Sequence, residues 1–113
     1  MRDQILALKD LPTIGVAIPE WDGTVVQVRA LTAGEAEQYG REALQAQSGG
    51  GSLLNMMARL VVKVVVDELG DRIFGDDDVD AVSGKNAKAV QRIFEAAQVV
   101  SGMAEEPEET GNV

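Results

Sequence analysis

The chain of 113 residues contains no cysteine and no histidine. Without cysteine it can form no disulfide bond, thiol nucleophile or thiolate zinc site. Without histidine it lacks the commonest general base near neutral pH and the commonest transition-metal ligand. The sequence therefore predicts no catalytic, cofactor-binding or metal-binding residues, and it favours a protein that is not an enzyme and acts by binding other proteins.

Aromatic residues are scarce as well, and long apolar runs are missing. The four aromatic residues are Trp21, Tyr39, Phe74 and Phe94, so we expect a core of aliphatic and methionine side chains. No stretch approaches the roughly 20 apolar residues of a membrane span, and the first residues lack the features of a signal peptide. We therefore expect a cytoplasmic protein. We also expect a single hydrophobic core, because a chain of this length has little room for two.

Positive charge is also in short supply, because 19 acidic residues face 10 basic ones and give a net charge of −9. Nucleic acids and anionic lipid surfaces bind cations that neutralise phosphate, so a polyanion is repelled by both. We therefore expect neither nucleic acid nor a membrane as a partner. The charge favours solubility and contact with a basic protein surface.

The N-terminal part predicts a short helix followed by a β-hairpin. The helix is expected over Asp3–Leu11, where the following proline would stop it. Apolar residues alternate with small ones over Ile14–Ile18, which is typical of a strand. Thr24–Leu31 is read as a second strand, with an apolar face of Val26, Val28 and Ala30 and an opposite face of Val25, Gln27 and Arg29. The turn between them ends in Asp-Gly and places Trp21 at its tip. This side chain is either a binding hot spot or, the interpretation we favour, a lid over the core.

A polar helix and a glycine-rich linker come next. Thr32 and Glu35 have the spacing of a capping box, which predicts a largely exposed helix over Ala33–Gln47. The linker covers Ser48–Ser52.

The segment Leu53–Glu68 is read as a central helix, although its valine runs alone would favour a strand. Its length exceeds that of an ordinary strand. Polar residues recur at intervals of four and would form one narrow stripe, the only wet face of this helix. The stripe consists of Asn55, Arg59, Lys63 and Asp67.

The C-terminal part predicts two further helices. Gly70 ends the central helix, and Ile73 and Phe74 are expected to anchor the next loop in the core. Asp76 is expected to cap a short helix through Val82. Ser83 or Gly84 should open the last helix, which should end at Gly102. Its apolar face should comprise Ala87, Val90, Ile93, Phe94, Ala97 and either Val100 or Ser101.

Together these elements predict an α+β domain over residues 1–102, with a short N-terminal β-hairpin packed on a mainly α-helical core. Residues 103–113 are predicted to form a disordered acidic tail.

A run of acidic residues raises the alternative of a calcium-responsive binding module. The run comprises Asp67, Glu68, Asp71, Asp76, Asp77, Asp78 and Asp80. Its spacing departs from that of an EF-hand loop, which needs alternating ligands, a central glycine and a closing glutamate. Helix capping and a solvated acidic face explain the same residues more simply.

Beyond these patterns, the sequence resembles the tail assembly chaperones of long-tailed bacteriophages. The order of the matching segments is its most specific feature, and the likeness extends over residues 5–102. In the first half the matching segments are Ile5–Ala7, Lys9–Thr13, Val16–Val25 and Val28–Thr32. In the second half they are Val66–Glu68, Gly70–Phe74, Asp78–Val79 and Arg92–Ala97.

The resemblance implies a non-enzymatic assembly factor in the cytoplasm of an infected bacterium. Such chaperones bind the long helical tape-measure protein, recruit tail-tube subunits and are absent from the finished virion. Many phages of this kind also make a longer product by ribosomal frameshifting. A homo-oligomer is a possible further partner, and the sequence does not specify the oligomeric state. The alternative is a structural head–tail connector or minor tail component, which would remain in the particle.

Overall fold

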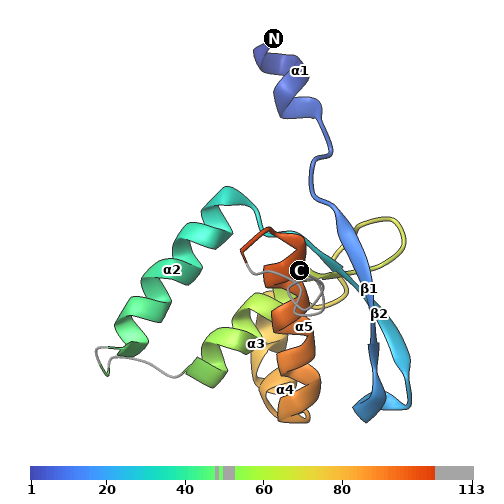
Figure 1. Ribbon diagram of the computed structural model, residues 1–113, viewed down its shortest axis with the longest axis vertical. Coiled ribbons are helices and arrows are strands. Elements are labelled where there is room, and N and C mark those ends of the chain that lie inside the picture. The colour runs from blue at the N-terminus through green and yellow to red at the C-terminus, as the bar shows by residue number, and fades with distance from the viewer. Residues whose placement is uncertain (48, 50–52, 104–113) are drawn as a thin grey trace, which may run out of the picture.

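The computed structural model describes residues 1–47, 49 and 53–103, and these form an α+β fold in which helices cover a small antiparallel sheet (Figure 1). The sheet has the strand order β1-β2-β3. The fold class predicted from the sequence is therefore confirmed. The elements are α1 (Arg2–Ala7), β1 (Thr13–Ile18), β2 (Thr24–Arg29), α2 (Ala33–Gln47), α3 (Leu53–Val64), β3 (Val65–Val66), α4 (Val79–Ser83) and α5 (Ala87–Val100), with 3-10 turns at Pro19–Trp21 and Asp76–Asp78.

The predicted β-hairpin is confirmed. Strands β1 and β2 pair from Thr13 opposite Arg29 to Ile18 opposite Thr24. The turn closes through Asp22 at φ 57° and Gly23 at φ 76°, a left-handed backbone that Gly and Asp tolerate better than most residues.

The C-terminal end of the predicted central helix is wrong. Helix α3 ends at Val64, and the next two residues form β3, which pairs with β2 through Val65 opposite Val28 and Val66 opposite Gln27. Val65 and Val66 are 2% and 1% exposed. Their β-branched side chains are favoured on a sheet, and here tertiary pairing with β2 decides between two local preferences.

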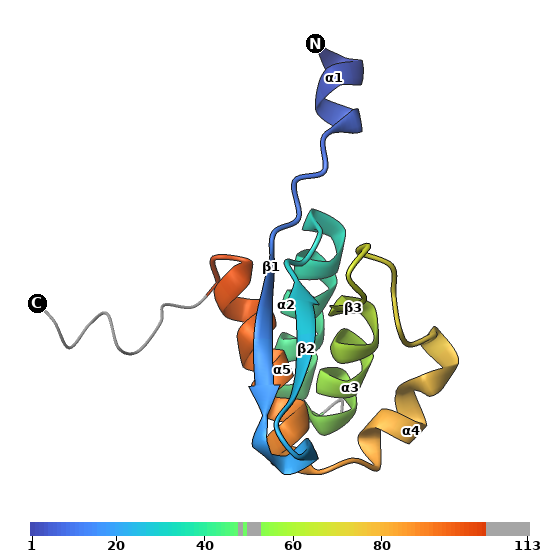
Figure 2. The same ribbon diagram turned by 90° about the vertical axis from the view of Figure 1, so that its right-hand side faces the viewer.

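The core lies between the sheet and the helices. Helix α5 packs against β1 and β2, and α3 packs against α5, α4 and α2 (Figure 2). The core is aliphatic, as the composition predicts, and Phe94 is the ring that it buries most fully among the described residues. Its members include Ile18, Val28, Leu31, Ala58, Leu60, Val61, Val62, Val64, Val65, Val82, Ala89, Val90, Ile93, Phe94 and Ala97.

The predicted cap of α2 is confirmed, whereas that of α5 is wrong. The Thr32 hydroxyl accepts from the Glu35 N–H at 3.2 Å, and the Glu35 carboxylate accepts from the Thr32 N–H at 3.0 Å. Helix α5 is opened by Asn86, whose side-chain oxygen accepts from the N–H groups of Lys88 and Ala89. Ser83 and Gly84 instead end the preceding helix, as the last residue and the C-cap of α4. The Asn86 side chain supplies the acceptor for orphan N–H groups that glycine lacks.

The last helix otherwise follows its predicted pattern. Of its predicted inward positions, Val90, Ile93, Phe94 and Ala97 are buried, whereas Val100 and Ser101 are half-buried. Ala87, the first residue of the helix, is exposed. Gly102 follows at φ 76°, as expected for a helix end.

The loop before α4 differs from prediction in two respects. Asp76 does not cap the helix, because its carboxylate accepts from Arg72 at 2.8 Å. The residue at the N-cap of the 3-10 turn is instead Gly75, whose N–H donates to the Asp78 carboxylate at 2.8 Å. Phe74 packs against the core as predicted, but Ile73 is 55% exposed and is no anchor.

Two predictions lie largely outside the described residues. These are the linker, apart from Gly49, and the tail beyond residue 103. Within the described part of the chain, no helix combines the length and hydrophobicity that crossing a membrane requires.

Candidate protein-binding surface

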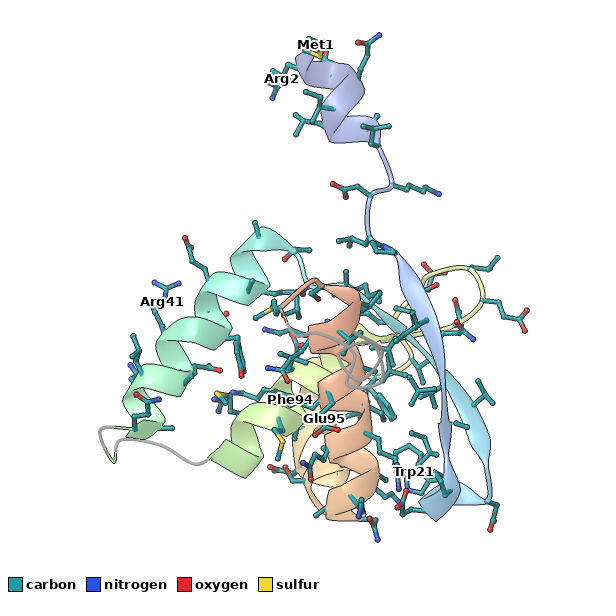
Figure 3. All side chains as sticks on the ribbon, viewed as in Figure 1. Met1, Arg2, Trp21, Arg41, Phe94 and Glu95 are labelled. Carbon is teal, nitrogen blue, oxygen red and sulfur yellow. The ribbon has the colours of Figure 1, made fainter. Side chains whose placement is uncertain are left out.

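An apolar groove lies where the hairpin turn meets the helices, at the end of the molecule where Figure 3 labels Trp21. It encloses about 460 Å³, a size typical of sites that bind small ligands or side chains. The lining residues come from the hairpin turn, α3, the loop before α4, and α4 with the residues that follow it. They are Trp21, Val61, Phe74, Ala81 and Val82, together with the charged residues Asp78 and Lys85. We refer to this set as the groove.

The hairpin wall of the groove is fixed by an ion pair with α5. The Arg92 guanidinium donates to both oxygens of Glu20, at 2.9 and 3.0 Å. These hydrogen bonds lower the pKa of Glu20 from its usual value. Beside them, the Thr24 hydroxyl donates to the Trp21 carbonyl oxygen at 2.6 Å. The turn is thereby held against the helical layer.

Trp21 serves in the way we favoured from the sequence, as a lid packed on the core. It is half-buried against the main cluster, and its remaining surface lines the groove. The sequence singled out Trp21 and Phe74 but not Val61 or Ala81. Their proximity depends on how the hairpin and helices pack, and no local sequence signal marks it.

A second apolar surface lies at the other end of the molecule. The N-terminal arm, residues 1–12, consists of α1 and an extended segment that leads away from the body (Figures 1 and 2). All residues of α1 are exposed. The most exposed apolar side chains of the arm are Met1 at 86%, Leu6 at 67%, Leu8 at 65% and Ile5 at 55%.

The arm helix is shorter than predicted. It ends at Ala7 rather than Leu11, since Leu8 is already extended at φ −69° and ψ 138°. No packing against the body supports further helical turns, so the chain leaves the helix before the proline is reached. The base of the arm is attached to the body, because the Ala30 N–H donates to the Pro12 carbonyl oxygen at 2.8 Å. A hollow of about 450 Å³ at this base has a mixed polar and apolar lining that includes Asp10, Leu11, Thr32 and Ser101.

The predicted polar stripe is the least buried face of α3 among the residues whose burial is described, but it is half-buried rather than fully wet, and Met57 is half-buried as well. Arg59 and Lys63 are half-buried and line a cavity of only about 30 Å³ between α3 and α2. Arg59 pairs with Glu42 of α2 at 3.1 Å. Asp67 lies beyond the end of the helix, and the side chain of Asn55 lies outside the described residues. This narrow, charged cavity is too small to admit a partner side chain.

Helix α2 is exposed as predicted, with no buried residue. Tyr39 attaches it to α5, with its ring centroid 5.6 Å from that of Phe94 and its hydroxyl accepting from Gln98 at 3.1 Å. At its start, Arg29 donates to both oxygens of Glu35, at 2.8 and 2.9 Å. That contact lowers the pKa of Glu35 from 4.5 to about 2.

Several acids of the suspected calcium run are engaged in local hydrogen bonds. One Asp67 oxygen accepts from the N–H groups of Leu69 and Asp71, and Asp76 and Asp78 make the contacts described above. Among the described residues, no group of three or more acidic side chains is arranged to hold a metal ion. The geometry offers no support for a calcium site.

The fold and its surfaces define a small α+β protein whose exposed features, an apolar groove and an apolar arm, suit the binding of other protein chains. Residues 7–111 match the family described as phage tail assembly chaperone, and the chain belongs to this family. The structure of the bacteriophage HK97 tail assembly chaperone has a similar fold, with a TM-score of 0.61 and 18% identity over 93% of this chain and 94% of that one. No curated protein sequence matches the chain.

Proposed function

We propose that this chaperone binds the phage tape-measure protein and helps to recruit tail-tube subunits. It acts without catalysis in the cytoplasm of the infected bacterium, and it is absent from the finished virion. The groove is the observation that supports this proposal most directly. It offers Trp21, Phe74 and Val82 to an apolar side chain, and membership of the chaperone family agrees with such a use.

The physical requirement is to cover apolar surface reversibly. A long amphipathic helix that is made before its tube exposes an apolar stripe, and such a stripe self-associates unless it is covered. Side chains spaced along one face of a helix can enter an apolar groove. The net charge of −9 then keeps the complex dispersed through repulsion between copies.

Co-expression with the tape-measure protein of the same phage tests this proposal. We expect a soluble complex that survives washing at high salt, because apolar contacts are not screened as ionic ones are. Ala81→Glu places a charge in the groove at an exposed position and should abolish capture. Val25→Glu is the matched control, since Val25 is an exposed apolar residue on β2 outside the groove, and it should leave capture unchanged.

Purified virions are probed in parallel. Absence of this protein from virions, together with a groove-dependent soluble complex, supports the proposal. Stoichiometric amounts in virions and no soluble complex would favour a head–tail connector or minor tail component instead. A complex that dissociates at high salt would show that the contact is ionic and does not use the groove.

A further inference from the structure

One wall of the groove is a single helical face. Four of its lining residues, Asp78, Ala81, Val82 and Lys85, belong to α4 and the turns at its two ends. Their spacing is i, i+3, i+4 and i+7, which places them side by side on one face of a helix. The helical course continues to the last of them, because Gly84 has φ −83° and ψ −1° and the Lys85 N–H donates to the Val82 carbonyl oxygen at 3.0 Å. The wall therefore presents an acid, two apolar residues and a base, in that order.

Neither charge of this wall has a partner of opposite charge within the described part of the chain. The Asp78 carboxylate accepts from the Gly75 N–H, a neutral donor, at 2.8 Å. Lys85 is exposed and takes part in none of the ion pairs formed among the described residues. The two charges are separated along the helix axis by about 10 Å, the rise of seven helical residues. A bound chain can pair with both of them without breaking an existing ion pair.

The apolar part of the groove lies between these two charges. Trp21, Val61 and Phe74 complete its lining. A large apolar side chain that enters the groove lies beside Ala81 and Val82, with the acid toward one end of the wall and the base toward the other. A helix that packs along α4 has the same periodicity as the wall. Residues about one turn before and one turn after its apolar anchor therefore come opposite the two charges.

We propose that the groove selects amphipathic helical segments whose large apolar anchor has a basic residue about one turn to one side and an acidic residue about one turn to the other. The basic residue pairs with Asp78 and the acidic residue with Lys85. This inference rests on the proposed function and names the client segments that the groove accepts. Apolar contact supplies most of the affinity. The two charges fix the position and direction of the client helix, since charged groups at an interface give specificity more than affinity.

Fluorescence of Trp21 reports whether the groove is occupied, because this residue lines the groove and is the only tryptophan of the chain. The probe is an amphipathic helical peptide of about 20 residues, long enough to form a helix. It contains no tryptophan and has a phenylalanine anchor, with arginine one turn before it and glutamate one turn after it. A second peptide has glutamine at both flanking positions. Both should change the emission of Trp21, and at low salt the charged peptide should bind about tenfold more tightly.

Double-mutant cycles assign each peptide charge to its partner. Replacing the glutamate of the peptide by glutamine should weaken binding to the native chain about threefold and leave binding to Lys85→Gln unchanged. Replacing the arginine by glutamine should behave in the same way toward the native chain and toward Asp78→Asn, which keeps an oxygen that can accept from Gly75. The matched controls Lys88→Gln and Asp80→Asn remove the same charges at exposed positions outside the groove lining, and both peptide changes should keep their full cost with them.

The possible results separate this inference from the proposed function. If both peptides change the emission of Trp21 but bind equally well, charge pairing is overturned and client binding in the groove stands. Equal coupling at the control positions would also overturn the pairing, because the effect would then come from the net charge of −9. If neither peptide binds, the inference fails. The proposed function fails with it only if Ala81→Glu also leaves capture of the tape-measure protein unchanged.

Discussion

Two contacts of the Glu35 carboxylate should make the stability of the fold depend on pH. Its carboxylate caps α2 through Thr32 and pairs with the Arg29 guanidinium, and the hydrogen bonds from Arg29 are the largest cause of its lowered pKa. Because the folded pKa of about 2 lies below the usual 4.5, the charged form is stabilised by folding. This stabilisation is fully present above about pH 5 and is lost as pH falls toward the folded pKa.

We predict that acidification from about pH 5 to pH 2.5 costs the native chain more stability than it costs Glu35→Gln. The difference should be about 1–2 kcal/mol, less than the full pKa shift implies because solvent screens the pair. Chemical unfolding of both proteins across this range measures it. Other paired acids, such as Glu20, affect both proteins equally and cancel in the comparison. Parallel pH dependences for the two proteins would contradict the prediction.

Leu60 and Arg59 are neighbours on α3 with different surroundings. Leu60 is 7% exposed within the core, whereas the Arg59 side chain is 41% exposed and paired with Glu42. Leu60→Ala should cost about 2–5 kcal/mol of unfolding free energy, as truncated core leucines do. Arg59→Ala should cost only about 0.2–1 kcal/mol. If denaturant unfolding finds both substitutions equally harmless, α3 is not part of the core.

At the scale of elements, the start of α5 depends on one side chain. The Asn86 oxygen accepts from two N–H groups that the helix itself cannot satisfy. Asn86→Ala should therefore destabilise the protein by about 1 kcal/mol, and Asn86→Asp, which retains an acceptor, should cost much less. Thermal unfolding of the two variants measures the difference. Equal losses would mean that the cap contributes nothing.

Sequence patterns correctly predicted those elements that are determined by residues close to one another in the chain. The hairpin follows from alternation and an Asp-Gly turn, and the start of α2 follows from the Thr32–Glu35 capping box. The end of α3 could not be predicted in the same way, because Val65 and Val66 suit either structure until β2 provides a pairing partner. The groove is still less predictable, since it brings Trp21 beside Ala81 through tertiary packing alone.

The molecule as a whole carries a net charge of −9, which would attract cations. We predict that millimolar calcium leaves the melting temperature unchanged within about 1 °C. The acids near α4 accept hydrogen bonds from neighbouring groups, and among the described residues they form no metal-binding cluster. A ligand that bound only the folded state would raise the melting temperature. A rise of several degrees that a chelator reverses would revive the calcium-responsive alternative.

Deletion of residues 1–8 tests whether the arm contributes to the stability of the body. No residue of α1 is buried, so the deletion removes little apolar contact from the isolated molecule. At low protein concentration the melting temperature should therefore stay within about 2 °C of that of the full chain. Calorimetry of dilute protein makes the measurement, with Val25→Glu as a surface control that keeps the arm. A large fall in melting temperature at low concentration would mean that the arm packs on its own body, because only an intramolecular contact stabilises a dilute monomer.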